Sequence, residues 1–153
     1  MIIRAGTINP EIATSEHDGR KAVYSTEKLS DGGGISQYGA RVQALEQGAR
    51  SSKRHWHEKE DECLFMLSGE AILVENDGEH IFHPGDAACW PAGIPNAHHL
   101  INRSSQACSY LVAGTRSSCD VCHYPDSGRT LYTQGEDWRV ENNGGTVLRS
   151  GKS

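Results

Sequence analysis

The sequence contains few aromatic side chains, 7% of its 153 residues, and no long apolar segment. The longest apolar runs, 63–67 and 71–74, are far too short to span a bilayer. The first residues lack the apolar stretch of a secretory signal. Five cysteines form an odd set without the spacing of a disulfide framework, as expected in a reducing compartment. These absences predict a cytoplasmic protein without membrane contact.

Positive charge is also scarce. Lysine and arginine number 15 against 20 aspartate and glutamate residues, for a formal net charge of −5. This balance gives no electrostatic basis for binding nucleic acid. Glycine is abundant instead: 17 glycines along the chain suggest many turns and therefore short strands.

Hydrophobic periodicity predicts an all-β chain with no convincing helix. Tyr38, Ala40, Val42 and Ala44 lie on one face of an expected strand by a period of two. Asp77-Gly78 is a strong signal for a tight hairpin turn. About eight strands are expected, in the ranges 35–45, 53–57, 62–68, 71–75, 79–82, 87–90, 98–102 and 107–115. A jelly roll or closed barrel is the natural arrangement for such a series.

Three segments follow from this pattern: an N-terminal extension (1–34), the barrel core (35–115) and a C-terminal segment packed on the barrel (116–153). The C-terminal segment contains a possible small hairpin, with strands at 138–141 and 146–148. Both faces of 62–67 are mostly apolar, so both should be covered. The second cover would be either another subunit or the terminal segments, and we expect a homodimer.

Two histidines and one glutamate suggest a metal site. His55 and His57 are two residues apart on an expected strand, so their side chains point the same way. Glu62 opens the next strand and can return to the same place. A histidine from the strand at 98–102 would complete a mixed nitrogen and oxygen set, which suits borderline divalent metals. The remaining positions around such an ion would be open to a substrate.

The chain resembles the cupin superfamily in two ordered motifs. The first is Gly48-x6-His55-x-His57-x4-Glu62-x6-Gly69, and the second is Gly85-x5-Pro91-x-Gly93-x4-His98-x3-Asn102. The resemblance covers roughly residues 35–115. It implies the double-stranded β-helix of cupins, a jelly-roll barrel with one divalent metal ion inside, which would be Zn, Mn, Fe, Ni or Co. The implied ligands are His55, His57, Glu62 and His98.

The fourth ligand has an alternative, because His99 adjoins His98 and the second motif has four residues after Gly93 where cupins commonly have two. The three-residue spacing to Asn102 favours His98. Strand alternation also favours it, since His98, Leu100 and Asn102 share one face.

The local sequence around these motifs is similar to a bacterial group of single-domain cupins. Its members are often left uncharacterised or named sugar phosphate isomerases by analogy. The expected function is a small metalloenzyme that chelates an oxygen-rich small molecule, such as a sugar phosphate, hydroxy-carbonyl compound or carboxylate. Isomerase, decarboxylase, lyase and dioxygenase chemistry all fit. The alternative is a cupin that binds a metal or small molecule without turnover.

The other candidate residues in the C-terminal segment each have more than one interpretation. Cys119 and Cys122 form a Cys-x-x-Cys that is either half of a zinc site, a redox pair or simply two cysteines near a loop. Tyr124 and Asp126 could supply acid–base groups at the barrel mouth or could only anchor the tail. Arg116 could steer an anionic substrate or lie on the surface.

Overall fold

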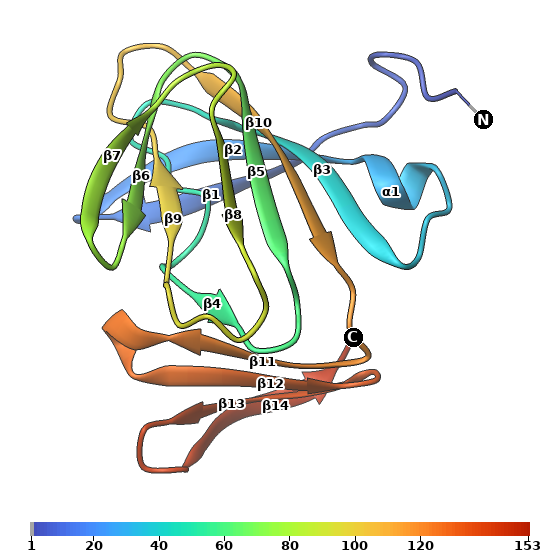
Figure 1. Cartoon of the computed structure of the whole chain (residues 1–153), viewed down its shortest axis with the longest axis vertical. Coiled ribbons are helices and arrows are strands. Elements are labelled where there is room, and N and C mark those ends of the chain that lie inside the picture. The colour runs from blue at the N-terminus through green and yellow to red at the C-terminus, as the bar shows by residue number, and fades with distance from the viewer. Residues whose placement is uncertain (1) are drawn as a thin grey trace.

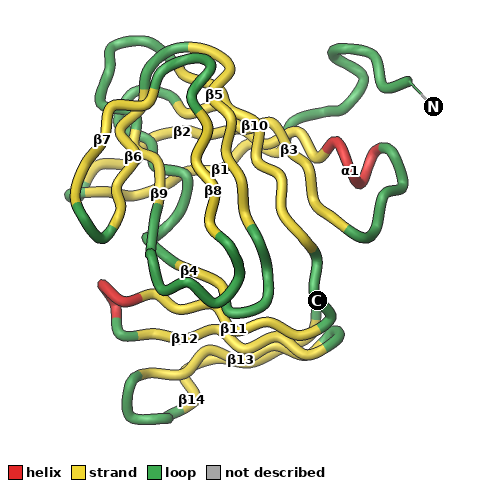
Figure 2. Tube along the Cα trace, viewed as in Figure 1, coloured by secondary structure: helices red, strands yellow, loops and turns green. Residues whose placement is uncertain are grey.

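The computed structural model describes residues 2–153, and in this part of the chain almost all regular structure is β (Figures 1 and 2). The strands are β1 (Glu11–His17), β2 (Arg20–Lys28), β3 (Tyr38–Leu45), β4 (Trp56–His57), β5 (Glu62–Ser68), β6 (Ala71–Glu75), β7 (Gly78–Phe82), β8 (Ala87–Trp90), β9 (His99–Ile101), β10 (Cys108–Thr115), β11 (Cys119–Tyr124), β12 (Arg129–Gln134), β13 (Asp137–Asn142) and β14 (Val147–Lys152). The all-β prediction is confirmed.

Helical structure in residues 2–153 is limited to α1 (Leu29–Gly32) and the 3-10 turn η1 (Pro125–Ser127). No convincing helix was expected, and α1 is a short exception to that expectation. This element is a single turn, too short to produce the 3.6-residue repeat by which a helix is recognised in sequence. Within the same residues, no helix has the length and apolar character needed to cross a membrane.

Two sheets form the barrel. One has six strands in the order β1-β2-β3-β10-β5-β8, and the other has three in the order β7-β6-β9. Alternate side chains of these strands point inward and form one core. The largest fully buried apolar members are Tyr110, Leu45, Met66, Leu100 and Val112. The first 34 residues contribute β1 and β2 to the six-stranded sheet, where Tyr24 pairs with Leu45 of β3.

The C-terminal residues form a third sheet, which lies below the barrel in Figure 1. Its order is β14-β13-β12-β11-β4, so its last strand is the two-residue β4 that precedes the barrel strand β5. The predicted terminal hairpin corresponds to β13 and β14. Because β4 belongs to this sheet, the segment 55–57 joins the barrel to the C-terminal sheet.

The turn after β5 requires a glycine. Gly69 has a φ of 73°, and a Cβ there would lie 2.7 Å from the carbonyl oxygen of Ala107. Any other residue would clash with backbone that has no room to move. This explains the glycine that ends the first motif.

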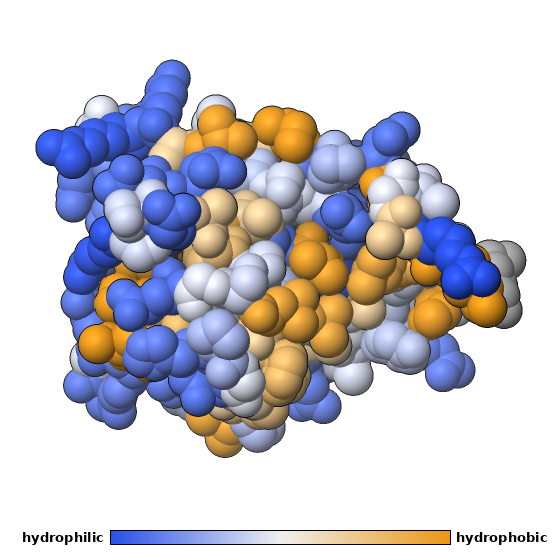
Figure 3. Space-filling view, turned by 90° about the horizontal axis from the view of Figure 1, so that it is seen from above, coloured by the Kyte–Doolittle hydropathy of each residue, from blue (hydrophilic) through white to orange (hydrophobic). Residues whose placement is uncertain are grey.

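The outer face of the six-stranded sheet is apolar and open. Leu64 and Met66 of β5 are buried, whereas the alternate residues Phe65 and Leu67 are 42% and 45% exposed. The terminal segments therefore do not cover this face. Other large apolar side chains are also exposed, and the view in Figure 3 shows such residues gathered in patches between polar areas.

Candidate metal centre

His55 and His98 are held opposite each other by backbone hydrogen bonds. The His55 N–H donates to the His98 carbonyl at 3.2 Å, and the His98 N–H donates to the His55 carbonyl at 2.9 Å. His57 is positioned by the other neighbour of this segment, since it pairs with Cys122 of β11. The three histidines thus reach one place from the barrel and from the C-terminal sheet.

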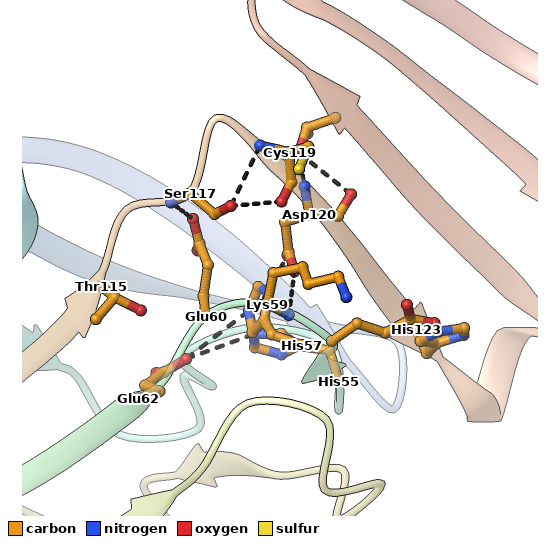
Figure 4. Close-up of polar contacts among 12 residues, drawn as sticks. His55, His57, Lys59, Glu60, Glu62, Thr115, Ser117, Cys119, Asp120 and His123 are labelled. Atoms are coloured by element: carbon orange, nitrogen blue, oxygen red, sulfur yellow. Dashed lines mark hydrogen bonds and ion pairs between the residues drawn. The ribbon is translucent and has the colours of Figure 1, made fainter.

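Glu62 supplies the carboxylate at the centre of this group. Its Oε2 atom lies 3.9 Å from Nε2 of His55, 3.9 Å from Nε2 of His57 and 3.8 Å from Nε2 of His98. Two ligands of one ion, each about 2.1 Å from it, can be at most about 4.2 Å apart. Each histidine is therefore close enough to Glu62 to share an ion with it, and the ligand atoms of His55, Glu62 and His98 all lie within 4.8 Å of one another. His57 joins this group through its contact with Glu62, and Figure 4 shows Glu62 facing His55 and His57.

The position of the proton on each of the three rings follows from the contacts of its Nδ1 atom. Nδ1 of His55 is 2.9 Å from the Lys53 carbonyl, and Nδ1 of His98 is 3.0 Å from the Asn96 carbonyl. Nδ1 of His57 is 2.6 Å from the Asp120 carboxylate. Carbonyl and carboxylate oxygens only accept, so each Nδ1 must carry the proton. A ring that carries only this proton presents a bare Nε2 toward Glu62.

Within residues 2–153, no lysine or arginine lies at ion-pair distance from Glu62. The Nε2 atom of His98 is buried without any hydrogen-bond partner, and its ring is stacked on Trp90 at a centroid distance of 3.5 Å. Three nitrogen lone pairs and a carboxylate facing one another repel unless a cation lies between them. The donor set therefore fits a divalent metal ion, as ligands must be deprotonated to bind one.

The electrostatics of the site agree with this state. Burial lowers the pKa of His55 to about 4, so its ring is neutral near pH 7. Burial opposes ionisation of Glu62, but the neighbouring His98, His55 and Arg41 outweigh it and lower the pKa of the carboxyl to about 2. An ionised carboxylate and neutral imidazoles are the forms in which these groups bind metals.

His99 points elsewhere. Its Nδ1 lies 3.1 Å from the Ser52 carbonyl, and in the described part of the chain it belongs to no group of metal-ligating side chains. The structure thus brings His98, not His99, together with His55 and Glu62.

Asp120 was missed from the sequence. It is only 6% exposed, its Oδ2 accepts the His57 Nδ1 proton at 2.6 Å, and its Oδ1 accepts the Lys59 N–H at 2.9 Å (Figure 4). A carboxylate in this place fixes the tautomer and orientation of a ligating histidine. The one sequence signal was a charged residue inside a strand whose alternate neighbours, Cys122 and Tyr124, share its face.

The candidate residues of β11 differ in their surroundings. Cys119 is exposed and Cys122 buried, three residues apart on one strand, so they face opposite sides and do not form a thiol pair. One nitrogen of each of His55 and His57 lies within 4.8 Å of the Cys122 sulfur. Tyr124 stacks on His55 with ring centroids 5.7 Å apart.

Two charged residues named from the sequence are engaged in ion pairs away from the histidines. Asp126 binds Arg54 with an oxygen–nitrogen distance of 2.6 Å, which fixes η1 against the segment before His55. Arg116 pairs with Asp31 and also donates to Ser30. These contacts give both residues a structural role, and neither side chain lines the cavity at the metal centre.

A small cavity of about 130 Å³ lies beside the metal centre. Its walls include the candidate ligands His55, Glu62 and His98 and the polar side chains Arg41, Gln43, Ser51, Ser52, His99, Tyr110 and Tyr124. At about 30 Å³ per water it has room for a few waters or for the chelating end of a small molecule.

Comparison with known proteins agrees with this geometry. The cupin domain model matches residues 41–114. A crystal structure from Silicibacter pomeroyi, described as a sugar phosphate isomerase of the cupin superfamily, is 32% identical over 97% of each chain, with a TM-score of 0.87. A protein from Acidithiobacillus ferrooxidans, whose name proposes the same activity, is 29% identical over 84% of this chain and 82% of its own, with a TM-score of 0.78.

A predicted oxalate decarboxylase from Thermotoga maritima is 19% identical over 76% of this chain and 100% of its own, and its TM-score of 0.62 shows a shared fold. Comparison with curated proteins gave no match. The chain belongs to the cupin superfamily, and the jelly-roll prediction is confirmed.

Proposed function

We propose that this cupin is a metal-dependent enzyme whose substrate is an oxygen-rich small molecule chelated at the centre formed by His55, His57, Glu62 and His98. The observation that carries the proposal is the orientation of the three rings: each Nδ1 faces an outer acceptor, and each Nε2 faces one carboxylate. The mixed donor set suits Zn, Mn, Fe, Ni or Co. A divalent ion bound there would supply Lewis acidity to substrate oxygens.

Tyr124 is the best candidate for contacting a substrate oxygen in that reaction. It lies over His55 and lines the cavity at the metal centre. Burial raises the pKa of its phenol, so the group stays protonated and can donate a hydrogen bond to a substrate oxygen. A half-buried donor beside the chelating groups favours an enzyme over a protein that only holds a metal.

Isomerisation of a sugar phosphate is the specific reaction that the relatives' names support. The Silicibacter pomeroyi protein is described as a sugar phosphate isomerase and is 32% identical to this chain. Such a reaction shifts a proton between neighbouring carbons of a hydroxy-carbonyl unit. It needs two adjacent substrate oxygens held in place, a hydrogen-bond donor near them and a base that takes the proton from carbon. The ligand set would hold the oxygens and Tyr124 would be the donor, whereas the base would be a further group.

The test is elemental analysis of the native protein followed by a screen of phosphorylated sugars and hydroxy acids for turnover. We expect about one divalent ion per chain and activity that disappears after chelation and returns with the metal. A His98→Ala variant that keeps its fold but loses both metal and turnover would support the site. If the wild type binds the ion and turns over no compound, the alternative of a non-catalytic binding protein holds.

We further propose that the protein is a homodimer formed through the outer face of the six-stranded sheet. The register places Val42, Leu111, Phe65 and Ala87 side by side across β3, β10, β5 and β8. An apolar row that crosses four strands in the open is typical of a protein–protein contact. A second copy related by a twofold axis would cover it with an identical row.

A further inference from the structure

A second, larger cavity of about 760 Å³ lies over the C-terminal sheet. One side is formed by Ser52 and Lys53, which precede the metal-site segment, and the other by side chains of β12, β13 and β14. Its volume is in the range of small-molecule binding sites, roughly 300–1,000 Å³. Nothing in the metal centre requires this space.

The large cavity continues from the metal centre. Ser52 and Tyr124 line both cavities. The sheet itself connects them, because neighbouring residues of paired strands point to the same face. One row of paired residues runs from His57 through Cys122 and Leu131 to Val140. The face that carries His57 and Asp120 therefore also forms the floor of the large cavity.

The charged side chains around the large cavity have one sign. Lys53, Arg129 and Arg149 line it, and no aspartate or glutamate side chain does, although acidic residues outnumber basic ones in the chain. Within residues 2–153, no carboxylate lies close enough to these three cations to form an ion pair. Several other arginines, including Arg54, Arg103 and Arg139, are paired with acids. The cavity thus keeps its positive charge available.

Apolar side chains form the floor between these cations. Leu131, Trp138, Val140 and Leu148 line the cavity, and the guanidinium of Arg149 lies 6.0 Å from the Trp138 ring centroid. An apolar floor strengthens the attraction between cations at its rim and an anion, because it displaces water from between them. It also offers a flat ring surface against which a carbon skeleton can pack.

We propose that this cavity binds an anionic group, a phosphate or a carboxylate, on the substrate whose oxygens are chelated at the metal centre. Lys53, Arg129 and Arg149 would bind the anion, and the rest of the substrate would pass Tyr124 to reach the metal. The inference rests on the proposed function for the chelated end, but the anion site itself requires no metal. It restricts the substrate to a molecule with two separate polar ends.

The experiment measures binding of inorganic phosphate to metal-free protein by calorimetry at constant ionic strength, with succinate in a parallel arm. We expect saturable binding that Arg129→Gln and Arg149→Gln each weaken about tenfold, as expected for loss of one charge-assisted hydrogen bond. Arg139→Gln is the matched control, since Arg139 lies on the opposite face of the same sheet, paired with Glu141. The tighter of the two probes identifies the anionic group.

Several results would overturn the anion site. Binding of neither probe by the wild type would do so, and so would equal weakening by Arg139→Gln, which would indicate only the general charge of the surface. A change of mass in light scattering for Arg149→Gln with unchanged phosphate affinity would assign the cavity to a protein contact instead. Cobalt titration of the same variants keeps the two proposals apart. Intact phosphate binding in a protein that binds no cobalt would leave the anion site standing and remove the proposed metalloenzyme.

Discussion

The clearest test of the metal centre is the substitution of Asp120 by asparagine. Asp120 is not one of the four proposed ligands, yet it holds His57 by a 2.6 Å hydrogen bond from a site only 6% exposed. Asparagine has the same shape, so the fold should tolerate it. The substitution removes a negative charge and replaces one acceptor oxygen with a donor NH2.

The size of the effect follows from which atom asparagine turns toward His57. One oxygen of Asp120 also accepts the Lys59 N–H at 2.9 Å. If the asparagine oxygen keeps that bond, its NH2 group faces Nδ1 of His57 and can only donate. The ring must then move its proton to Nε2, the atom that would bind the metal. Loss of such an outer partner typically costs 10- to 100-fold in metal affinity, and the upper end, about 2.7 kcal/mol, is expected here.

The assay is a cobalt or zinc titration against a chelator of known affinity. Asp126→Asn is the matched control, because it is the same change in the same segment and Asp126 binds Arg54 instead of a histidine. Asp126→Asn should lower metal affinity far less than Asp120→Asn. Equal affinities for the wild type and the Asp120 variant would refute the role given to this carboxylate, as would equal losses in both variants.

Three further predictions concern other parts of the molecule. His98→Ala should abolish metal binding and His99→Ala should leave most of it, which metal analysis of the two variants checks; loss only in the His99 variant would reverse the assignment. Burial lowers the pKa of His99 from 6.5 to about 4, so the unfolded chain takes up the proton first as the pH falls. The metal-free protein should therefore lose stability between about pH 6.5 and 4, and His99→Asn should flatten this part of the curve of Tm against pH. Phe65→Asp should convert a dimer into a monomer in light scattering, and a wild type that is monomeric at micromolar concentration would remove the dimer proposal.

The barrel strands were predictable because their signals are local. Asp77-Gly78 predicts the hairpin of β6 and β7, and Gly78 adopts a positive φ in the structure. The alternation of 38–44 corresponds to β3. Each of these features depends on a residue and its near neighbours, which a sequence shows directly.

The arrangement around His57 was not predictable in the same way. The expected strand 53–57 is reduced to β4, Trp56–His57, and His55 is held by an isolated bridge to His98. The partner of β4 is β11, more than sixty residues later, and no local pattern encodes a pairing over that distance. Asp120 could therefore not be assigned to His57 from spacing, although the motif itself gave the histidine.

The two sides of the metal centre depend on different parts of the fold. His55 and His98 are fixed to each other by backbone hydrogen bonds at the barrel mouth, whereas His57 depends on Asp120 of the C-terminal sheet. The same sheet carries Tyr124 over His55 and forms the floor of the large cavity. A change that shifts this sheet would alter the orientation of His57, the position of Tyr124 and the proposed anion site together. The third sheet therefore belongs to the functional site as much as the barrel does, and relatives that share only the barrel should differ in what they bind.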